Sequence, residues 1–307
     1  MFQKIVVTLD GTPEAATVLP LAEQLLPARD AEMILVRVTP NYHVDAPVNI
    51  AAREDLARVA ADTGLADKRV RTALLYGDVA EQIVEEARSA GADLIAMATH
   101  GRGGLARAWL GSVTEQVLAH SPVPVLVLRA GATPPTALRT LLVPFDATPG
   151  SIAALAVARE IAAITGARLT LIQVIPPLPR WGDGWDIEPG WEEETRAAVQ
   201  HTLDWLTQGL SARGVTASGR AVVGAVEKTI VAAARDEAAD LIVMGTHALT
   251  GPKRALLGSV ADAIVQRAPM PVLLVRHTKG DTTTISTLID DHEEARPDVI
   301  RHADAGA

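Results

Sequence analysis

Two glycine-rich stretches of the chain contain residue types at a spacing that could bind a phosphate group. The first reads ATHGRGGLARAWLGSV over residues 98–113, and its near copy reads GTHALTGPKRALLGSV over residues 245–260. In both, a Gly-Ser pair precedes an apolar segment with helical spacing, and the N–H groups at the start of a helix attract anions. Neither stretch is a P-loop or a dinucleotide-binding glycine motif. The alternative is a tight turn in which Ser112 or Ser259 only caps the helix.

A histidine lies inside each stretch, and it could act as a general base or as a metal ligand. His100 and His247 occupy the same place in the two copies. No cluster of histidine and carboxylate residues accompanies them at metal-ligand spacing, so a hydrogen bond that orders the loop is the favoured role. The chain contains no cysteine, which excludes disulfides, thiolate zinc sites and cysteine nucleophiles.

The composition of the 307-residue chain restricts the partners that we expect. Hydrophobic residues make up 48% and charged residues 21%, which is typical of a soluble globular protein. The formal net charge of −9 disfavours binding to nucleic acid or to an anionic membrane. The first residues lack the layout of a signal peptide, and no apolar run is long enough to span a bilayer. We therefore expect a cytoplasmic protein with no nucleic-acid or membrane partner.

The elements that must position these stretches are themselves duplicated. KIVVTLDGT at residues 4–12 matches TLLVPFDAT at 140–148, which is an offset of 136. DLIAMATH at 93–100 matches DLIVMGTH at 240–247, which is an offset of 147. The second copy therefore carries eleven extra residues between its second and third strands. A repeat of this length indicates two structural units of one kind.

Within each copy, strand patterns alternate with helix patterns. Continuous apolar runs are typical of strands buried on both faces of a parallel sheet, and the first copy has them at residues 5–9, 34–38, 94–98 and 123–128. A weaker strand at 71–76 completes five. The pattern predicts an α/β protein with two tandem doubly wound domains, each a five-stranded parallel sheet flanked by helices.

The repeat also predicts the domain boundaries. We place the first domain at residues 1–131 and the second at 139–277, followed by a loose polar tail over 278–307. The fifth strands, at 123–128 and 270–275, are apolar and lie at sheet edges, which need a cover. We therefore expect the two domains to pack against each other with pseudo-twofold symmetry.

The segments around the glycine-rich stretch of each copy resemble a known family. The pattern D-L-I-[AV]-M-x-T-H, followed by a glycine loop, L-G-S-V and P-V-P-V-L-V-L-R, is similar to the universal stress protein family over nearly all of residues 2–277. The resemblance implies a fold like that of the adenine nucleotide alpha hydrolases. It also implies ATP binding, with or without Mg²⁺, in members that carry G-x2-G-x9-G-[ST]. The first copy reads Ala98-x2-Gly101-x9-Gly111-Ser112, and the second reads Gly245-x2-Ala248-x9-Gly258-Ser259.

The resemblance assigns nucleotide contacts residue by residue in both copies. In the first copy they are Thr8, Asp10, Gly11, Val38, Ala98, His100, Gly101, Arg102, Gly104, Gly111, Ser112, Val113 and Thr114. In the second copy they are Pro144, Asp146, Val174, Gly245, His247, Ala248, Gly251, Gly258, Ser259 and Val260.

The two predicted sites are unequal. Ala98 closes a strand, where an extended backbone suits alanine, whereas Ala248 lies in the loop, where a left-handed backbone or a close phosphate favours glycine. Ala147 replaces Gly11 in the second copy and narrows the pocket from the other side. The first site is therefore predicted to bind ATP more tightly.

The sequence predicts a nucleotide-dependent regulator of a stress response, in which ATP stabilises one conformation of a homodimer. No residue is assigned a catalytic role. Two alternatives stay open: a slow ATPase, against which the absence of a Walker-type lysine counts, and a nucleotide-free interaction protein, with which the alanine replacements agree.

Overall fold

The computed structural model describes residues 2–26, 30–40, 43–65, 69–99, 110–178, 190–246, 257–277, 283–289, 297 and 300. The chain forms two compact units. Unit 1 contains Met1–Leu138 and Thr246–Arg276, and unit 2 contains Arg139–Gly245 and His277–Ala307. The end of the second repeat thus belongs to the same unit as the first repeat. The domain boundaries drawn from the repeat stay a prediction.

The sheet of unit 1 has the strand order β3-β2-β1-β4-β5-β10. Its strands are β1 (Lys4–Thr8), β2 (Glu32–Thr39), β3 (Val70–Tyr76), β4 (Leu94–Thr99), β5 (Val125–Arg129) and β10 (Val272–Arg276). The first five are parallel, and β10 runs antiparallel to β5. This is the predicted doubly wound order, and the direction of winding reverses between β1 and β4. Ligands of such sheets bind beyond the carboxyl ends of the strands at that reversal.

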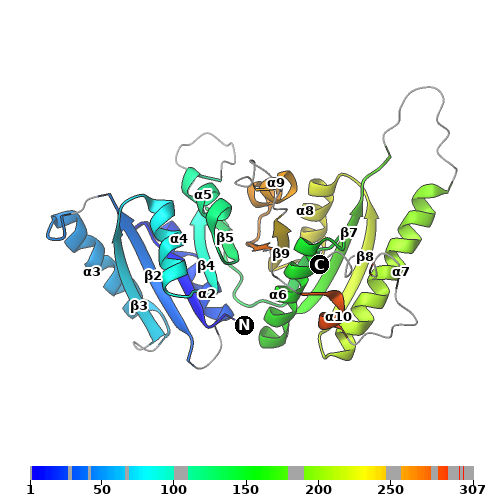
Figure 1. Ribbon diagram of the computed structural model, residues 1–307, viewed down its shortest axis with the longest axis horizontal. Helices are drawn as coiled ribbons and strands as arrows, with labels where there is room; N and C mark the ends of the chain where they lie inside the picture. The colour runs from blue at the N-terminus through cyan, green and yellow to red at the C-terminus, as the bar shows by residue number, and fades with distance from the viewer. Residues whose placement is uncertain are drawn as a thin grey trace, which may run out of the picture. The chain divides into compact units, whose positions relative to one another are not determined.

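Helices cover both faces of this sheet. They are α1 (Pro13–Ala16), α2 (Leu19–Leu25), α3 (Pro47–Asp62), α4 (Val79–Ser89), α5 (Ser112–His120) and α9 (Ser259–Arg267). In Figure 1, α4 lies in front of the strands and α2 behind them. The sequence sets the ends of α4: the Asp78 side chain accepts a hydrogen bond from the Glu81 N–H at 3.0 Å, and Gly91 follows the helix at φ +60°.

Unit 2 repeats the design with the strand order β9-β6-β7-β8, all parallel. Its strands are β6 (Thr140–Pro144), β7 (Arg168–Ile175), β8 (Ala217–Val223) and β9 (Leu241–Thr246). Its helices are α6 (Pro149–Thr165), α7 (Trp191–Ala212), α8 (Val226–Asp236) and α10 (Ile285–Leu288). In both units the middles of the central strands are buried, as the continuous apolar runs predicted, and in β4 every residue is buried.

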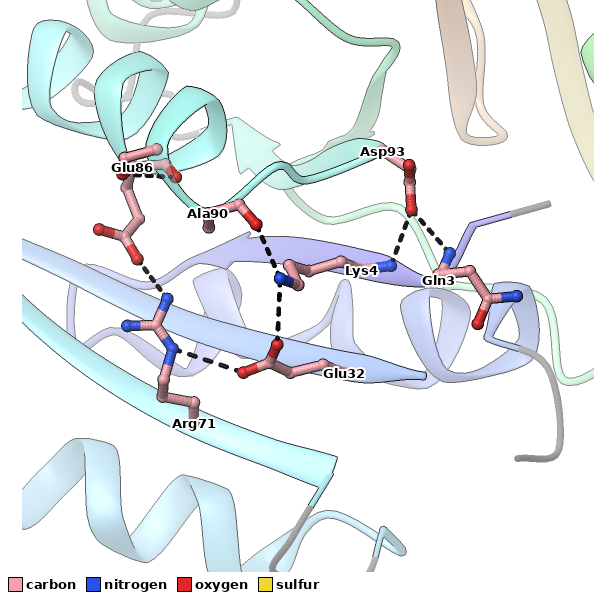
Figure 2. Close-up of polar contacts among 8 residues, drawn as sticks. Gln3, Lys4, Glu32, Arg71, Glu86, Ala90 and Asp93 are labelled. Atoms are coloured by element: carbon pink, nitrogen blue, oxygen red, sulfur yellow. Dashed lines mark hydrogen bonds and ion pairs between the residues drawn. The ribbon is translucent and has the colours of Figure 1, made fainter. Parts of the chain in front are cut away.

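An aspartate before the fourth strand of each repeat aligns that strand with the first one. Asp93 accepts hydrogen bonds from the N–H groups of Gln3 and Lys4 at 2.8 and 2.9 Å. Asp240 accepts the same pair of bonds from Arg139 and Thr140, also at 2.8 and 2.9 Å. Figure 2 shows this arrangement around Asp93. The carboxylates satisfy N–H groups that begin the strands, at the end of the sheet opposite to the candidate site.

The fifth strands of the two repeats pair with each other inside unit 1. Leu126 lies opposite Leu273 in the antiparallel β5–β10 ladder. Two equivalent arginines then make reciprocal bonds: Arg129 donates to the Gln266 carbonyl at 2.9 Å, and Arg276 donates to the Ala119 carbonyl at 2.8 Å. Each of these two apolar strands thus covers one edge of the other, whereas the pseudo-twofold packing of the two domains stays a prediction.

The described part of the C-terminal tail differs from the loose segment expected from its polarity. Ile285, Leu288 and Ile289 are buried. A Cβ atom on Gly209 of α7 would lie 2.7 Å from the Ile289 Cβ, so the absence of a side chain there lets the tail approach the helix. Arg213 also donates to the Thr287 carbonyl at 3.2 Å. A few apolar residues in a polar sequence are sufficient to hold this segment on α7.

Candidate functional site

The described residues of the first-copy site lie at the carboxyl edge of the sheet in unit 1. Thr8 ends β1, Val38 is near the end of β2, and Ala98 is near the end of β4. The ladder between β1 and β2 extends one step further, because the Leu9 N–H donates to the Val36 carbonyl at 2.8 Å. The turn that begins at Asp10 therefore starts from a fixed point beside β2.

The turn after β1 is held by its own side chains. Asp10 accepts hydrogen bonds from the Thr12 N–H at 2.9 Å and from the Thr12 hydroxyl at 2.7 Å. The Thr12 hydroxyl in turn accepts from the Ala15 N–H at 3.2 Å and caps α1. Gly11, between them, has φ +87°, a conformation that glycine adopts without strain. The carboxylate of Asp10 is thus fixed in place at the winding reversal.

The second copy builds the same turn with an alanine at its centre. Asp146 accepts from the Thr148 N–H at 3.2 Å and from its hydroxyl at 2.6 Å. Ala147 has φ +59°, in the left-handed region that costs an alanine about 1–2 kcal/mol. The sequence predicted a narrower pocket here. The structure adds that this alanine is under backbone strain.

Arg37 is a residue of the site that the sequence analysis missed. A Cβ atom on Gly11 would lie 2.5 Å from the Arg37 Nη1 atom, so the guanidinium group packs directly on the glycine. Arg37 also forms an ion pair of 3.2 Å with Asp55 of α3, and both side chains are about three-quarters buried. Gln173 stands at the equivalent place in the second copy. A charged residue inside the apolar run MILVRVTP was the available signal.

The Gly-Ser pair begins a helix in both copies, but not in the way that a capping serine would. Ser112 and Ser259 are the first residues of α5 and α9, the preceding glycines are the N-caps, and neither helix has a side-chain cap. The alternative in which these serines cap the helices through their side chains is therefore wrong. Gly111 has φ +81° and ψ +136°, whereas Gly258 has φ −59°, which any residue can adopt. Val113 and Thr114 follow in the first turn of α5.

Gly245, the first glycine of the second-copy motif, has a packing role. A Cβ atom there would overlap the backbone of Gly150 near the start of α6. In the first copy, Ala98 replaces this glycine and Glu14 stands in place of Gly150. Ala98 lies within β4, so its backbone is extended, as predicted. The absence of a side chain at Gly245 therefore lets the start of α6 lie close to the end of β9.

The structure leaves several predicted contacts untested. His100, Gly101, Arg102, Gly104, His247, Ala248 and Gly251 lie outside the described residues. In the second copy, Pro144, Asp146, Val174 and Gly245 belong to unit 2, whereas Gly258, Ser259 and Val260 belong to unit 1. All described residues of the first-copy site belong to unit 1.

Within the described ranges, no group of three or more histidine, aspartate or glutamate residues could hold a metal ion. In the same part of the chain, no helix combines the length and apolar character that crossing a membrane requires.

Comparisons with known proteins match both halves of the chain. The model of the universal stress protein family matches residues 1–129 and 137–276. A universal stress protein of Mycolicibacterium smegmatis is 26% identical over 293 residues, which cover 89% of this chain and 96% of that protein. One of Thermus aquaticus is 33% identical over 139 residues, 45% of this chain and 98% of that protein. The crystal structure of a universal stress protein from Archaeoglobus fulgidus has the same fold, with a TM-score of 0.67, 20% identity and 91% and 97% of the two chains covered.

Proposed function

The chain belongs to the universal stress protein family, and we propose that it is a cytoplasmic, homodimeric regulator that binds ATP, with or without Mg²⁺. The first-copy site is the principal one in this proposal, and the second-copy site binds more weakly. No residue is proposed to be catalytic.

The observation that carries the proposal is the ordered edge of unit 1. The Asp10 carboxylate is fixed by Thr12 on one side of the winding reversal. The first-copy motif leads on the other side into α5, whose first N–H groups follow a glycine at φ +81°. A fixed carboxylate can bind ribose or base N–H and O–H donors, and a helix N-terminus favours phosphate. The Asp10 carboxylate thus suits the nucleoside of a nucleotide, and the N-terminus of α5 suits its phosphates.

Within this proposal each described residue has a role. The backbone of Val38 and the carboxylate of Asp10 hold the nucleoside, while Gly111 and Ser112 present N–H groups and a hydroxyl to the phosphates. The turn at Asp10 is already closed by its own hydrogen bonds, so binding there costs little ordering. Within this proposal the bound nucleotide stabilises one conformation of the homodimer, and that conformation is the regulatory signal.

Calorimetric titration of the full-length protein with ATP tests the assignment. We expect binding, and we expect Gly101→Val or Gly111→Val to weaken it by at least about tenfold, or about 1.4 kcal/mol. Gly131→Val is the matched control, because Gly131 also has a positive φ, +78°, with open space around it and no part in the motif. It places a valine at another positive φ outside the motif and is expected to leave the affinity for ATP unchanged.

The two alternatives give different results in the same preparation. A protein with no heat of binding for any adenine nucleotide, and none bound after purification, would be an interaction protein of the nucleotide-free kind. Steady release of phosphate from ATP, lost in the Gly111→Val variant, would instead make it an ATPase. Ala248→Gly tests the order of the sites, since it is expected to strengthen only the weaker one.

A further inference from the structure

The outer strands of the two units, β3 and β8, differ in what meets their free edges. An edge strand presents unpaired N–H and C=O groups, and proteins usually block such groups because another strand can pair with them. In unit 2 the block is a single side chain. In unit 1 the corresponding edge has no such block among the described residues.

Gln200 of α7 blocks the edge of β8. Its amide nitrogen donates to the Gly219 carbonyl at 2.9 Å, and its amide oxygen accepts from the Ala221 N–H at 2.9 Å. These are the outward-facing groups of alternate residues, so the amide takes the place that the backbone of a further strand would occupy. The outer edge of unit 2 is thereby closed at its centre.

The direction of the backbone groups in β3 follows from the same register. The Gly77 N–H donates to the Thr39 carbonyl of β2 at 3.1 Å, as the Gly224 N–H does to Ile175 in unit 2. Alternate residues point to opposite sides, so the N–H and C=O groups of Thr72 and Leu74 point away from β2. Within the described part of the chain, no hydrogen bond reaches these four groups.

The helix that covers β3 makes its polar contacts elsewhere. Arg53 of α3 donates to the Tyr76 hydroxyl at 2.7 Å and to the Val44 carbonyl at 2.9 Å. It does not reach the centre of the strand edge. Of these two outer strands, β8 is blocked by Gln200, and β3 offers a central pair of residues that no hydrogen bond reaches within the described part of the chain.

We propose that two copies of this chain associate through β3, which pairs antiparallel with the partner's β3 about a twofold axis at Ala73. Thr72 then exchanges both of its backbone hydrogen bonds with the partner's Leu74, and Leu74 does so with the partner's Thr72. This inference specifies the homodimer of the proposed function and does not depend on nucleotide binding.

The charges and sizes of the side chains select this register. Ala73 faces its own copy at a non-hydrogen-bonded position, where two strands approach most closely and a small side chain fits. Arg71 then lies opposite the partner's Leu75, so the two guanidinium groups stay apart. A twofold axis at Arg71 would place them directly opposite each other. Arg71 is moreover paired with Glu86 at 2.6 Å and with Glu32 at 3.5 Å, as Figure 2 shows.

Sedimentation analysis of the full-length protein and of Thr72→Pro provides the first test. Proline is tolerated on an edge strand where the N–H points outward. In the proposed dimer, however, it removes one hydrogen-bond donor from each copy, and its ring clashes with the partner's β3. We expect the dimer dissociation constant to rise by at least about tenfold, or about 1.4 kcal/mol. Thr72→Val, which keeps the N–H, is the matched control and should leave it unchanged. The affinity for ATP should be the same in all three proteins.

A cysteine scan tests the register independently of proline. The natural chain contains no cysteine, so Ala73→Cys introduces a single thiol. At a non-hydrogen-bonded antiparallel pair the two Cα atoms lie about 4.5 Å apart, within the range that a disulfide bridges. We expect Ala73→Cys to form a disulfide-linked dimer under mild oxidation, and Thr72→Cys to stay monomeric on a denaturing gel.

A wild-type protein that is monomeric at every concentration, or a dimer that Thr72→Pro leaves intact while Ala73→Cys does not cross-link, overturns the proposal. If Thr72→Pro is unfolded by circular dichroism, the cross-link at position 73 decides alone. ATP binding by a protein that fails both tests would leave the ATP-binding part of the proposed function standing and overturn only the β3-mediated homodimer.

Discussion

Replacing Gly11 with alanine is expected to destabilise the protein, and replacing Arg37 with glutamine in addition is expected to recover part of the loss. The double variant reproduces the pair Ala147 and Gln173 of the second copy. The two residues touch in the first copy, because a Cβ on Gly11 would lie within 2.7 Å of both terminal nitrogens of Arg37. Their contributions to stability should therefore not be additive.

The expected cost has three parts. An alanine at φ +87° is strained by about 1–2 kcal/mol. The smaller freedom of alanine in the unfolded chain returns about 0.4–1 kcal/mol. The Arg37 side chain is flexible and can yield, but it then leaves Asp55, and a pair that is only partly exposed contributes about 0.2–1 kcal/mol. The net destabilisation of Gly11→Ala is about 1–2 kcal/mol.

Urea unfolding followed by circular dichroism measures the cycle of Gly11→Ala, Arg37→Gln and the double variant. We expect the double variant to lose less free energy of unfolding than the two single variants lose together, by about 0.5 kcal/mol or more. Gly131→Ala, at φ +78° with no atom near its Cβ, reports the backbone strain alone. Additive effects, or a cost for Gly11→Ala no larger than for Gly131→Ala, would show that Arg37 does not pack on the turn as described.

Two further predictions concern stability. Gly111→Ala should destabilise the protein by about 1–3 kcal/mol, because φ +81° with ψ +136° is closed to alanine; Gly258→Ala, at φ −59°, should be neutral or stabilising by about 0.4–1 kcal/mol in the same melts. Burial raises the pKa of Glu23, against a backbone hydrogen bond from Gly64 that lowers it, so the folded state binds this proton more tightly than the unfolded state and loses that advantage as the pH rises through the folded pKa. At pH 7 the buried carboxylate is charged and destabilises the folded state, so Glu23→Gln should raise the Tm more at pH 7 than at pH 4. An equal shift in Tm at both pH values would show that burial does not raise the pKa of Glu23.

The strands and the doubly wound fold class could be predicted from the sequence, because buried apolar strands that alternate with helices leave few possible arrangements. The apolar residues of the runs at 5–9 and 94–98 became buried neighbours, and the order β3-β2-β1-β4-β5 is one of the few doubly wound orders that right-handed crossovers allow. The pairing of β5 with β10 was predictable for a similar reason, since both are apolar and each needs a cover. The resemblance to a family supplied the fold independently.

The details of the candidate site were less predictable because they depend on contacts between residues distant in the sequence. The residues next to Gly11 in the sequence do not show that Arg37 packs on it. Nor do the neighbours of Gly245 show that the backbone of Gly150 comes too close to leave room for a side chain there. Ser112 does not cap α5, because Gly111 occupies the N-cap position. Gly111 has a positive φ there, a conformation that would strain a serine. The apolar residues of the tail are few, and a pattern of composition cannot show that Ile285 and Ile289 reach α7.

The differences between the copies come in matched pairs, and this bears on how the second copy should be regarded. Gly11 with Arg37 becomes Ala147 with Gln173, and Ala98 with Glu14 becomes Gly245 with Gly150. In the first case the methyl group of alanine is accommodated where the guanidinium group is gone; in the second, a glycine appears where a helix backbone comes close. Random loss of a binding site would not be expected to adjust both members of a contact. The second copy is a separately packed version of the same edge, so its weaker binding of ATP, where titration finds it, should trace to the loop around Ala248 and not to a disordered turn at Asp146.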